Sequence, residues 1–196
     1  WHLGYAALIM GRPDVIEAYT EQARESGWEG MEPLALEGGG ASERGDIDRA
    51  EQLWIKALPD RAEQIRMSIK AIKARHVDAE TAKMLATLAP YGPPGVGRFA
   101  VQGMSRDVEG GLATIQGTLD PASLRKADGS GGPARSRGGD GIGSVLRADW
   151  WMPEAAAMRR DPRFAAIMHD IGLVEFWREF GWPDKCKPAE NGVKCE

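Results

Sequence analysis

The sequence predicts an all-α protein: a solenoid of antiparallel helix pairs, closed at its carboxyl end by an atypical, aromatic-rich helical cap. Three observations support this fold class. Small residues recur at a spacing of 34 positions over the first sixty residues, and apolar residues at helical spacing continue to about residue 120. A tryptophan-rich segment then follows a long Gly-rich stretch. Solenoids expose an apolar face at their last repeat, so an atypical terminal segment is expected to cover it.

Small residues repeat in register across the first two predicted units. The matched pairs are Gly4 with Gly38, Ala7 with Ala41, Gly11 with Gly45, and Ala23 with Ala57. Small side chains on a first helix let a second helix approach closely. Gly11 and Gly45 then suit the left-handed position at which many helices end. In the second unit Ala50, Trp54 and Ala57 lie at i, i+4 and i+7, which is one apolar stripe of a helix.

This pattern resembles the tetratricopeptide repeat family. The second unit carries Gly38, Ala41, Gly45, Ala50, Trp54, Ala57 and Pro59, and the first carries Leu3, Gly4, Ala7, Gly11 and Ala23. The first unit departs from the family by having Ile16 in place of alanine and Thr20 in place of an aromatic residue. The resemblance implies stacked helix pairs that bind partner proteins. A chance repeat in an ordinary helical bundle is the alternative reading.

Two degenerate units are expected to follow. Ile65, Ile69 and Ile72 place an apolar stripe on a helix over residues 61–75, and Asp78 suits the N-cap of a second helix. A short helix around Phe99 and another ending near residue 119 form the last pair. The predicted units therefore lie near residues 1–27, 28–60, 61–90 and 95–120.

Residues 121–148 are predicted to form a flexible loop, because the stretch is rich in Gly, Ser and Pro and poor in apolar residues. A phosphate-binding loop is the sharper alternative. It is disfavoured because the stretch has no Gly-Lys-Ser/Thr ending and follows no predicted strand. Helix starts are expected near Pro153 and Asp161 in the segment 149–196, and Gly172 is expected to end the second helix.

The carboxyl-terminal segment resembles a recurrent ending of bacterial multi-domain tetratricopeptide proteins. The resembling residues are Arg160 to Phe164, Gly172-Leu173, Trp177, and Trp182 to Asp184 with Cys186. Repeats in such proteins often follow a winged-helix or nucleotide-cyclase domain, whose motifs this sequence does not contain. Because the sequence starts at Trp1 without a leader, we expect further residues upstream. The Trp cluster is interpreted as a cap, with a ligand platform as the alternative.

Cys186 and Cys195 are predicted to form a disulfide across a short loop, which would place the protein in an oxidising compartment such as the periplasm. Two free thiols in the cytoplasm are the alternative. No metal site and no cofactor are predicted, because the Cys and His spacings typical of metal sites are missing. The sequence also shows no nucleophile elbow and no Ser-His-Asp order, so we predict a protein that is not an enzyme.

The predicted function is that of a scaffold that binds a partner peptide or helix in the concave groove of its first helices. The groove residues are Tyr5, Leu8 and Ile9 in the first unit and Ala35, Gly39, Ser42 and Glu43 in the second. They include none of the Lys, Arg or Asn side chains that grip a terminal carboxylate, which favours an apolar or basic peptide. The alternatives are a permanent accessory subunit, with a second apolar surface at Trp150-Trp151, or the regulatory tail of a cyclase or transcription regulator.

The composition narrows the predicted partners further. The formal net charge of −4 argues against nucleic acid, and no small-molecule substrate is predicted. No run of about eighteen apolar residues is present, so no transmembrane segment is expected in this chain.

Overall fold

A computed structural model describes residues 2–28, 30–90, 97–119, 148–189 and 192–196. These residues are mostly helical, with one small two-stranded sheet. The all-α class is therefore confirmed in its coarse form. The flexible loop predicted for residues 121–148 lies outside the described residues, apart from residue 148.

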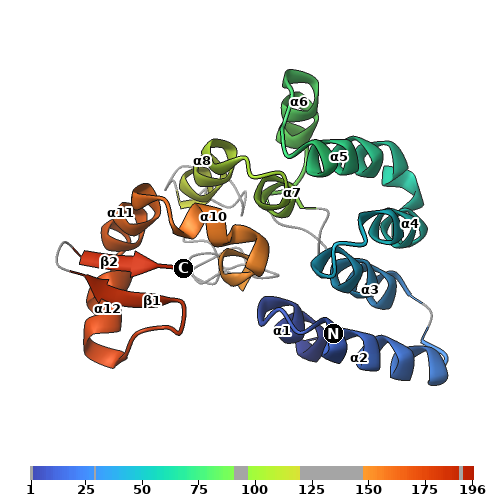
Figure 1. The fold of residues 1–196 in the computed structure, drawn as a ribbon, viewed down its shortest axis with the longest axis horizontal. Helices are drawn as coiled ribbons and strands as arrows, with labels where there is room; N and C mark the ends of the chain where they lie inside the picture. The colour runs from blue at the N-terminus through green and yellow to red at the C-terminus, as the bar shows by residue number, and fades with distance from the viewer. Residues whose placement is uncertain (1, 29, 91–96, 120–147, 190–191) are drawn as a thin grey trace, which may run out of the picture.

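Eight α-helices and one short 3-10 helix are described between residues 2 and 119, and Figure 1 shows them following an arc. Their bounds are α1 (His2–Ile9), α2 (Pro13–Glu25), α3 (Met31–Glu43), α4 (Ile47–Ala57), η1 (Pro59–Arg61), α5 (Ala62–Ala74), α6 (Ala79–Thr87), α7 (Arg98–Met104) and α8 (Val108–Leu119). Neighbours along the chain pack on each other from α1 to α6, and α7 packs on both α5 and α8.

The carboxyl-terminal module, residues 149–196, packs against α1, α7 and α8 (Figure 1). Its elements begin at residue 148 and are η3 (Ala148–Trp151), η4 (Pro153–Ala155), α10 (Ala156–Arg159), α11 (Pro162–Asp170), α12 (Leu173–Phe180), β1 (Cys186–Ala189) and β2 (Gly192–Cys195). The helix starts expected near Pro153 and Asp161 are present, and Asp161 caps α11 by accepting a hydrogen bond from the Arg163 backbone N–H.

One backbone turn joins α1 to α2, α3 to α4, α5 to α6 and α7 to α8, and the same turn also ends α2 at Gly27, whose φ is 75°. The residue at the turn has a φ of 62° at Gly11, 81° at Gly45, 49° at Arg75 and 61° at Arg106. In each case its N–H donates to the carbonyl three residues back, and the next N–H donates to the carbonyl five residues back from itself. This is the Schellman ending of a helix. The turn is thus the same whether glycine or arginine occupies it.

Small residues of the repeat lie where helices approach most closely. The indole ring of Trp54 lies against Gly38, and a Cβ atom at Gly38 would overlap that ring. The Trp54 Nε1 donates a hydrogen bond to the Ala35 carbonyl at 3.2 Å, so the buried indole keeps a polar partner. Ala41 and Ala50 are fully buried between the same helices. The repeat positions of the second unit therefore work as helix contacts.

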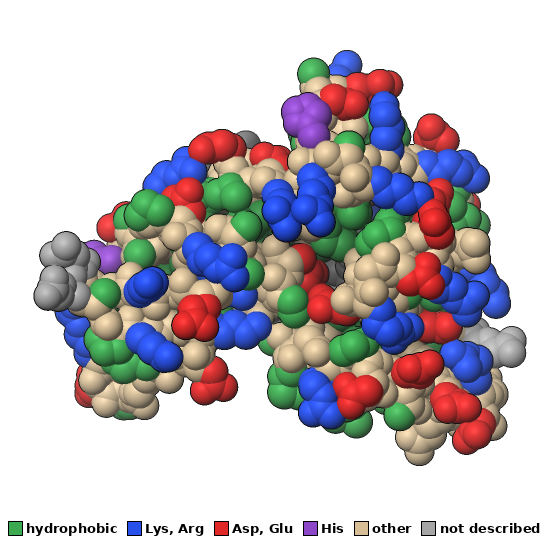
Figure 2. All heavy atoms as spheres, viewed as in Figure 1, with side chains coloured by type: hydrophobic (Ala, Val, Ile, Leu, Met, Phe, Trp, Pro, Cys, Tyr) green, Lys and Arg blue, Asp and Glu red, His purple; other side chains and the backbone are tan. Residues whose placement is uncertain are grey.

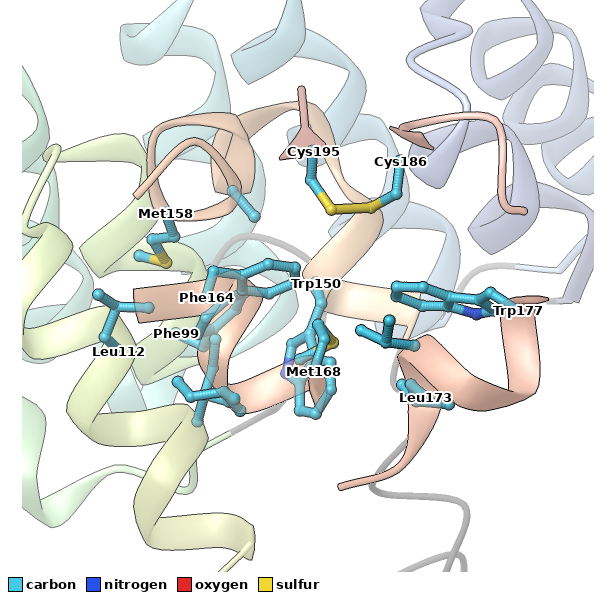
Figure 3. Close-up of a cluster of buried hydrophobic side chains, with 14 residues drawn as sticks. Phe99, Leu112, Trp150, Met158, Phe164, Met168, Leu173, Trp177, Cys186 and Cys195 are labelled. Carbon is cyan, nitrogen blue, oxygen red and sulfur yellow. A yellow bond between two sulfur atoms is a disulfide. The ribbon is translucent and has the colours of Figure 1, made fainter. Parts of the chain in front are cut away.

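The core of the carboxyl-terminal module is aromatic and includes residues from α7 and α8 (Figure 3). Trp150 and Phe164 are both fully buried and meet edge to face, with 6.5 Å between ring centroids. Phe99 and Leu112 contribute to the same cluster from the helix pairs. The last helix pair and the module consequently share one hydrophobic core.

Two short strands follow α12 at the carboxyl end of the described residues. β1 and β2 form an antiparallel hairpin in which Cys186 pairs with Cys195. The two Sγ atoms lie 2.00 Å apart, at disulfide distance, which agrees with the predicted pairing. Cys186 is 1 % exposed and Cys195 4 % exposed, both within the aromatic core. A short hairpin that follows the last helix therefore contributes to this core.

Candidate functional site

The residues predicted to line the groove are largely covered. Leu8 on α1 and Ala35 and Gly39 on α3 are buried, whereas Tyr5, Ile9, Ser42 and Glu43 are half-buried. Ala35 lies against α4, where its carbonyl accepts the Trp54 hydrogen bond. The predicted set of residues is therefore not an open surface in this structure.

Residues 149–154 of the same chain, here named the docked segment, cover part of this face. The Tyr5 hydroxyl donates a hydrogen bond to Asp149 Oδ1 at 2.8 Å across a separation of 144 residues. Met152 is 2 % exposed and joins the apolar cluster that contains Leu8, Ile16 and Leu36. The segment therefore combines one polar contact with one deeply buried side chain, as bound peptides commonly do.

Close backbone approaches surround the other end of the docked segment. An added Cβ atom at Gly11 would lie 3.2 Å from Pro153 Cγ. One at Gly103, on α7, would lie 2.9 Å from the Glu154 carbonyl oxygen, closer than side chains tolerate. Gly103 thus permits the segment to pass against α7, and the docked segment is held from both α1 and α7.

Two cations of the carboxyl-terminal module hold the docked segment by its backbone. Arg159 Nη1 donates to the carbonyls of Trp150 at 2.6 Å and Met152 at 2.8 Å, and its Nε donates to the Glu196 carbonyl at 2.5 Å. Lys185 Nζ donates to the Trp151 carbonyl at 2.6 Å. Burial lowers the pKa of Arg159 to about 10. Arg159 is therefore cationic at neutral pH, and both Arg159 and Lys185 bind the backbone of the segment rather than its side chains.

Two carboxyl groups meet where the docked segment reaches α3. Glu43 Oε2 lies 3.9 Å from the position of an added Cβ atom at Gly11, beside Pro153 Cγ at 3.2 Å, so Glu43 lies next to the residue that precedes Glu154. Burial, reinforced by the charges of Glu43 and Asp149, raises the pKa of Glu154 to about 8. Burial also raises the pKa of Glu43, against the opposing effects of the Glu154 hydrogen bond and the Lys185 charge. Figure 2 shows acidic side chains in the hollow at the middle of the molecule.

A separate small pocket lies between α2 and α3. Its volume is about 120 Å³, and its lining includes Glu17, Arg24, Glu37 and Arg44. Arg24 and Arg49 both bind the Glu37 carboxylate, at 3.1 Å and 3.0 Å. Both arginines that line the pocket therefore have a carboxylate partner there, since Arg44 also lies 3.9 Å from Glu17. Among the described residues, no group of three or more His, Cys, Asp or Glu side chains is placed to hold a metal ion.

The sequence did not reveal the residues that hold the docked segment. Glu154, Arg159 and Lys185 belong to no motif, and their roles depend on contacts across the fold. The apolar surface expected at Trp150-Trp151 is also absent, because Trp150 is fully buried and Trp151 packs against the same core.

Exposed aromatic residues lie instead on α12. Phe176 is 52 % exposed and Phe180 67 % exposed, and their ring centroids lie 4.7 Å apart. The opposite face of α12 is buried through Leu173, Val174 and Trp177. One face of α12 is therefore buried in the core, and the opposite face exposes two neighbouring phenylalanines to solvent.

Searches with this sequence and structure found no matching family model, no matching curated protein and no matching solved structure. In the part of the chain that the structure describes, every helix is too short or too polar to cross a membrane.

Proposed function

We propose that this chain is a protein-binding scaffold of the tetratricopeptide type, which binds a partner segment on the face where its own residues 149–154 lie. The observation that carries the proposal is the docked segment itself. It places Met152 among Leu8, Ile16 and Leu36, and Asp149 on the Tyr5 hydroxyl. A partner segment with the same features would meet the same contacts once the docked segment has moved away.

Support for the repeat type comes from the four Schellman turns that join the helices of each pair and from the contact of Gly38 with Trp54. Identical turns join helices into pairs of similar geometry, and stacked pairs of this kind build curved solenoids. Four of the predicted groove residues, Tyr5, Leu8, Ser42 and Glu43, lie at or beside the docked segment or α7. The apolar Met152 fits the expected apolar partner peptide.

A peptide-binding experiment tests the proposal. The full chain with Met152→Asp places a charge in an apolar cluster, which should release the docked segment. A labelled peptide of residues 148–156 should then bind this variant at least about tenfold more tightly than the unchanged protein, by fluorescence anisotropy, because an internal competitor has been removed.

Met10→Asp is the matched control, because Met10 is 65 % exposed. This variant should bind the peptide no better than the unchanged protein. A peptide in which Asp replaces the methionine should bind neither variant. If Met152→Asp keeps its helical circular dichroism and still does not bind the peptide, the face does not recognise such segments and the proposal is wrong.

A second candidate function, a permanently assembled accessory subunit, is favoured by Phe176 and Phe180. Two neighbouring exposed phenylalanines on the outer face of a helix are typical of a surface that a partner covers. Sedimentation velocity would test one form of this function, in which the partner is a second copy. Phe176→Ser with Phe180→Ser should then abolish self-association, whereas Met31→Ser, at another exposed apolar residue, should not.

A further inference from the structure

The contact between Glu43 and Glu154 joins two parts of the molecule. Glu43 lies at the end of α3 in the helix pairs, and Glu154 lies in η4 of the carboxyl-terminal module. Glu154 Oε2 is shielded from solvent and has no hydrogen-bond partner within the described part of the chain. Burying a carboxylate with one unpaired oxygen costs far more free energy than burying the protonated carboxyl group.

The charged and titratable groups around Glu154 come from several elements. They are Glu43 on α3, Asp149 on η3 with Tyr5 on α1 behind it, Arg159 on α10, and Lys185 before β1. From α7 the contact is Gly103, which carries no charge. Arg159 donates hydrogen bonds to the backbone carbonyls of Trp150, Met152 and Glu196. Lys185 donates one to the carbonyl of Trp151. Their charges attract both glutamates, but no ion pair to Glu154 is formed among the described residues.

One proton is therefore best shared between the two glutamates while the segment is docked. With that proton on Glu154, its carboxyl group can donate to the Glu43 carboxylate, and the pair carries one negative charge instead of two. Removing that proton leaves two adjacent carboxylates in a largely dehydrated contact. The segment can relieve this repulsion by leaving the face, which returns both carboxylates to water.

We infer that the Glu43–Glu154 pair makes docking of residues 149–154 sensitive to pH, so that the segment is held firmly in mild acid and loosens as the solution becomes alkaline. This inference goes beyond the proposed function, because it concerns the chain's own segment and needs no partner.

The direction follows from the two states of Glu154. Burial raises the pKa of Glu154 to about 8 when the segment is docked, from its ordinary value of 4.5 in water. Both states are protonated below pH 4.5, so docking is unaffected there. Between pH 4.5 and about 8 only the docked state keeps the proton, and docking weakens with each step in pH. Glu43 acts in the same direction, because its pKa is also raised.

Native-state hydrogen exchange on the full chain tests the inference. The reporter is the Ala155 backbone N–H, which donates to the Met152 carbonyl at 3.1 Å. Its protection factor, corrected for the intrinsic exchange rate, should fall by about tenfold or more between pH 5 and pH 8. Glu154→Gln keeps the side-chain shape and removes the titration, so its protection should change by less than about threefold over that range.

Three comparisons make the outcome decisive. Glu80→Gln, at an exposed carboxylate on α6, should behave like the unchanged protein. Amides of α5 should keep their protection, which separates local release from global unfolding. If Glu154→Gln does not fold, Glu43→Gln supplies the same test and should also flatten the pH dependence. The inference is overturned if the unchanged protein shows no pH dependence at Ala155, or if the folded glutamine variant shows the same dependence.

Discussion

The helix pairs and the carboxyl-terminal module are stabilised in different ways. From α1 to α6 each helix rests on its neighbours in the chain, and the same turn joins the helices of each pair. The module instead collects distant residues: Trp150, Phe164 and Trp177 share a core with Phe99 and Leu112, and Cys186 is joined to Cys195 within it. Short-range repetition leaves a periodic signal in a sequence, whereas a single shared core does not.

The largest expected effect concerns the contact between two helices of one pair. Trp54→Ala should lower the free energy of unfolding by about 3–5 kcal/mol, because it empties a site that is 1 % exposed and leaves the Ala35 carbonyl without its donor. Chemical denaturation measures this loss. Trp28→Ala, at a residue 40 % exposed, should cost less than about 1 kcal/mol. Equal losses at the two positions would show that Trp54 is not a helix contact.

Removal of the disulfide should give the next largest loss of stability, and this loss should be confined to the carboxyl-terminal module. Replacing Cys186 and Cys195 together by alanine opens a loop whose ends are nine positions apart, and should cost about 2–3 kcal/mol. Hydrogen exchange should place the loss in α11, β1 and β2, because β2 packs on α11. If α3 and α4 lose as much protection as the hairpin, the two regions do not differ as described.

Substitutions at the recurring turn should change stability less, and Gly45 and Arg75 should respond differently. Gly45→Ala forces a side chain to adopt a φ of 81°, which should cost about 1 kcal/mol although nothing lies within 4 Å of the added Cβ. Arg75 already adopts a φ of 49°. Arg75→Gly relieves that cost and frees the unfolded chain, so stability should change by less than about 0.5 kcal/mol. Thermal unfolding of the two variants provides the measurement.

The smallest effect concerns the N-cap of α11 at acidic pH. Asp161 accepts hydrogen bonds from the Arg163 side chain and backbone, which lower its pKa to about 2. Its stabilising contribution is present above pH 3.8 and is lost as the pH falls through about 2. Asp161→Asn should therefore reduce the decline in Tm between pH 5 and pH 2. Asp184→Asn, at an exposed carboxylate, should leave that decline unchanged.

Sequence reasoning succeeded where the determining contacts are local. The caps at Asp78 and Asp161 and the turns at Gly11 and Gly45 follow from residue types beside helix ends. The Cys pairing was also accessible, since only two cysteines exist. The turns at Arg75 and Arg106 were not, because arginine carries no signal for a left-handed backbone.

The docked segment could not be inferred from the sequence, because its contacts span most of the chain. Tyr5 and Asp149 are 144 positions apart, and no spacing rule connects them. Glu154 is the only charged residue between Trp150 and Met158, but no motif marks it, and its contacts with α3 and α7 arise only in the folded chain. The exposure of Phe176 was likewise hidden, since its spacing on α12 fits an apolar stripe.

Arg159 constrains how relatives of this chain could vary. Its guanidinium reads three backbone carbonyls, at positions 150, 152 and 196, rather than any side chain. Every amino acid supplies such a carbonyl, so this network places no demand on residue type at those three positions. The network requires a particular residue only at position 159. The planar guanidinium of arginine reaches all three carbonyls, whereas the single ammonium group of lysine would not. Across homologues, position 159 should therefore vary far less than position 196.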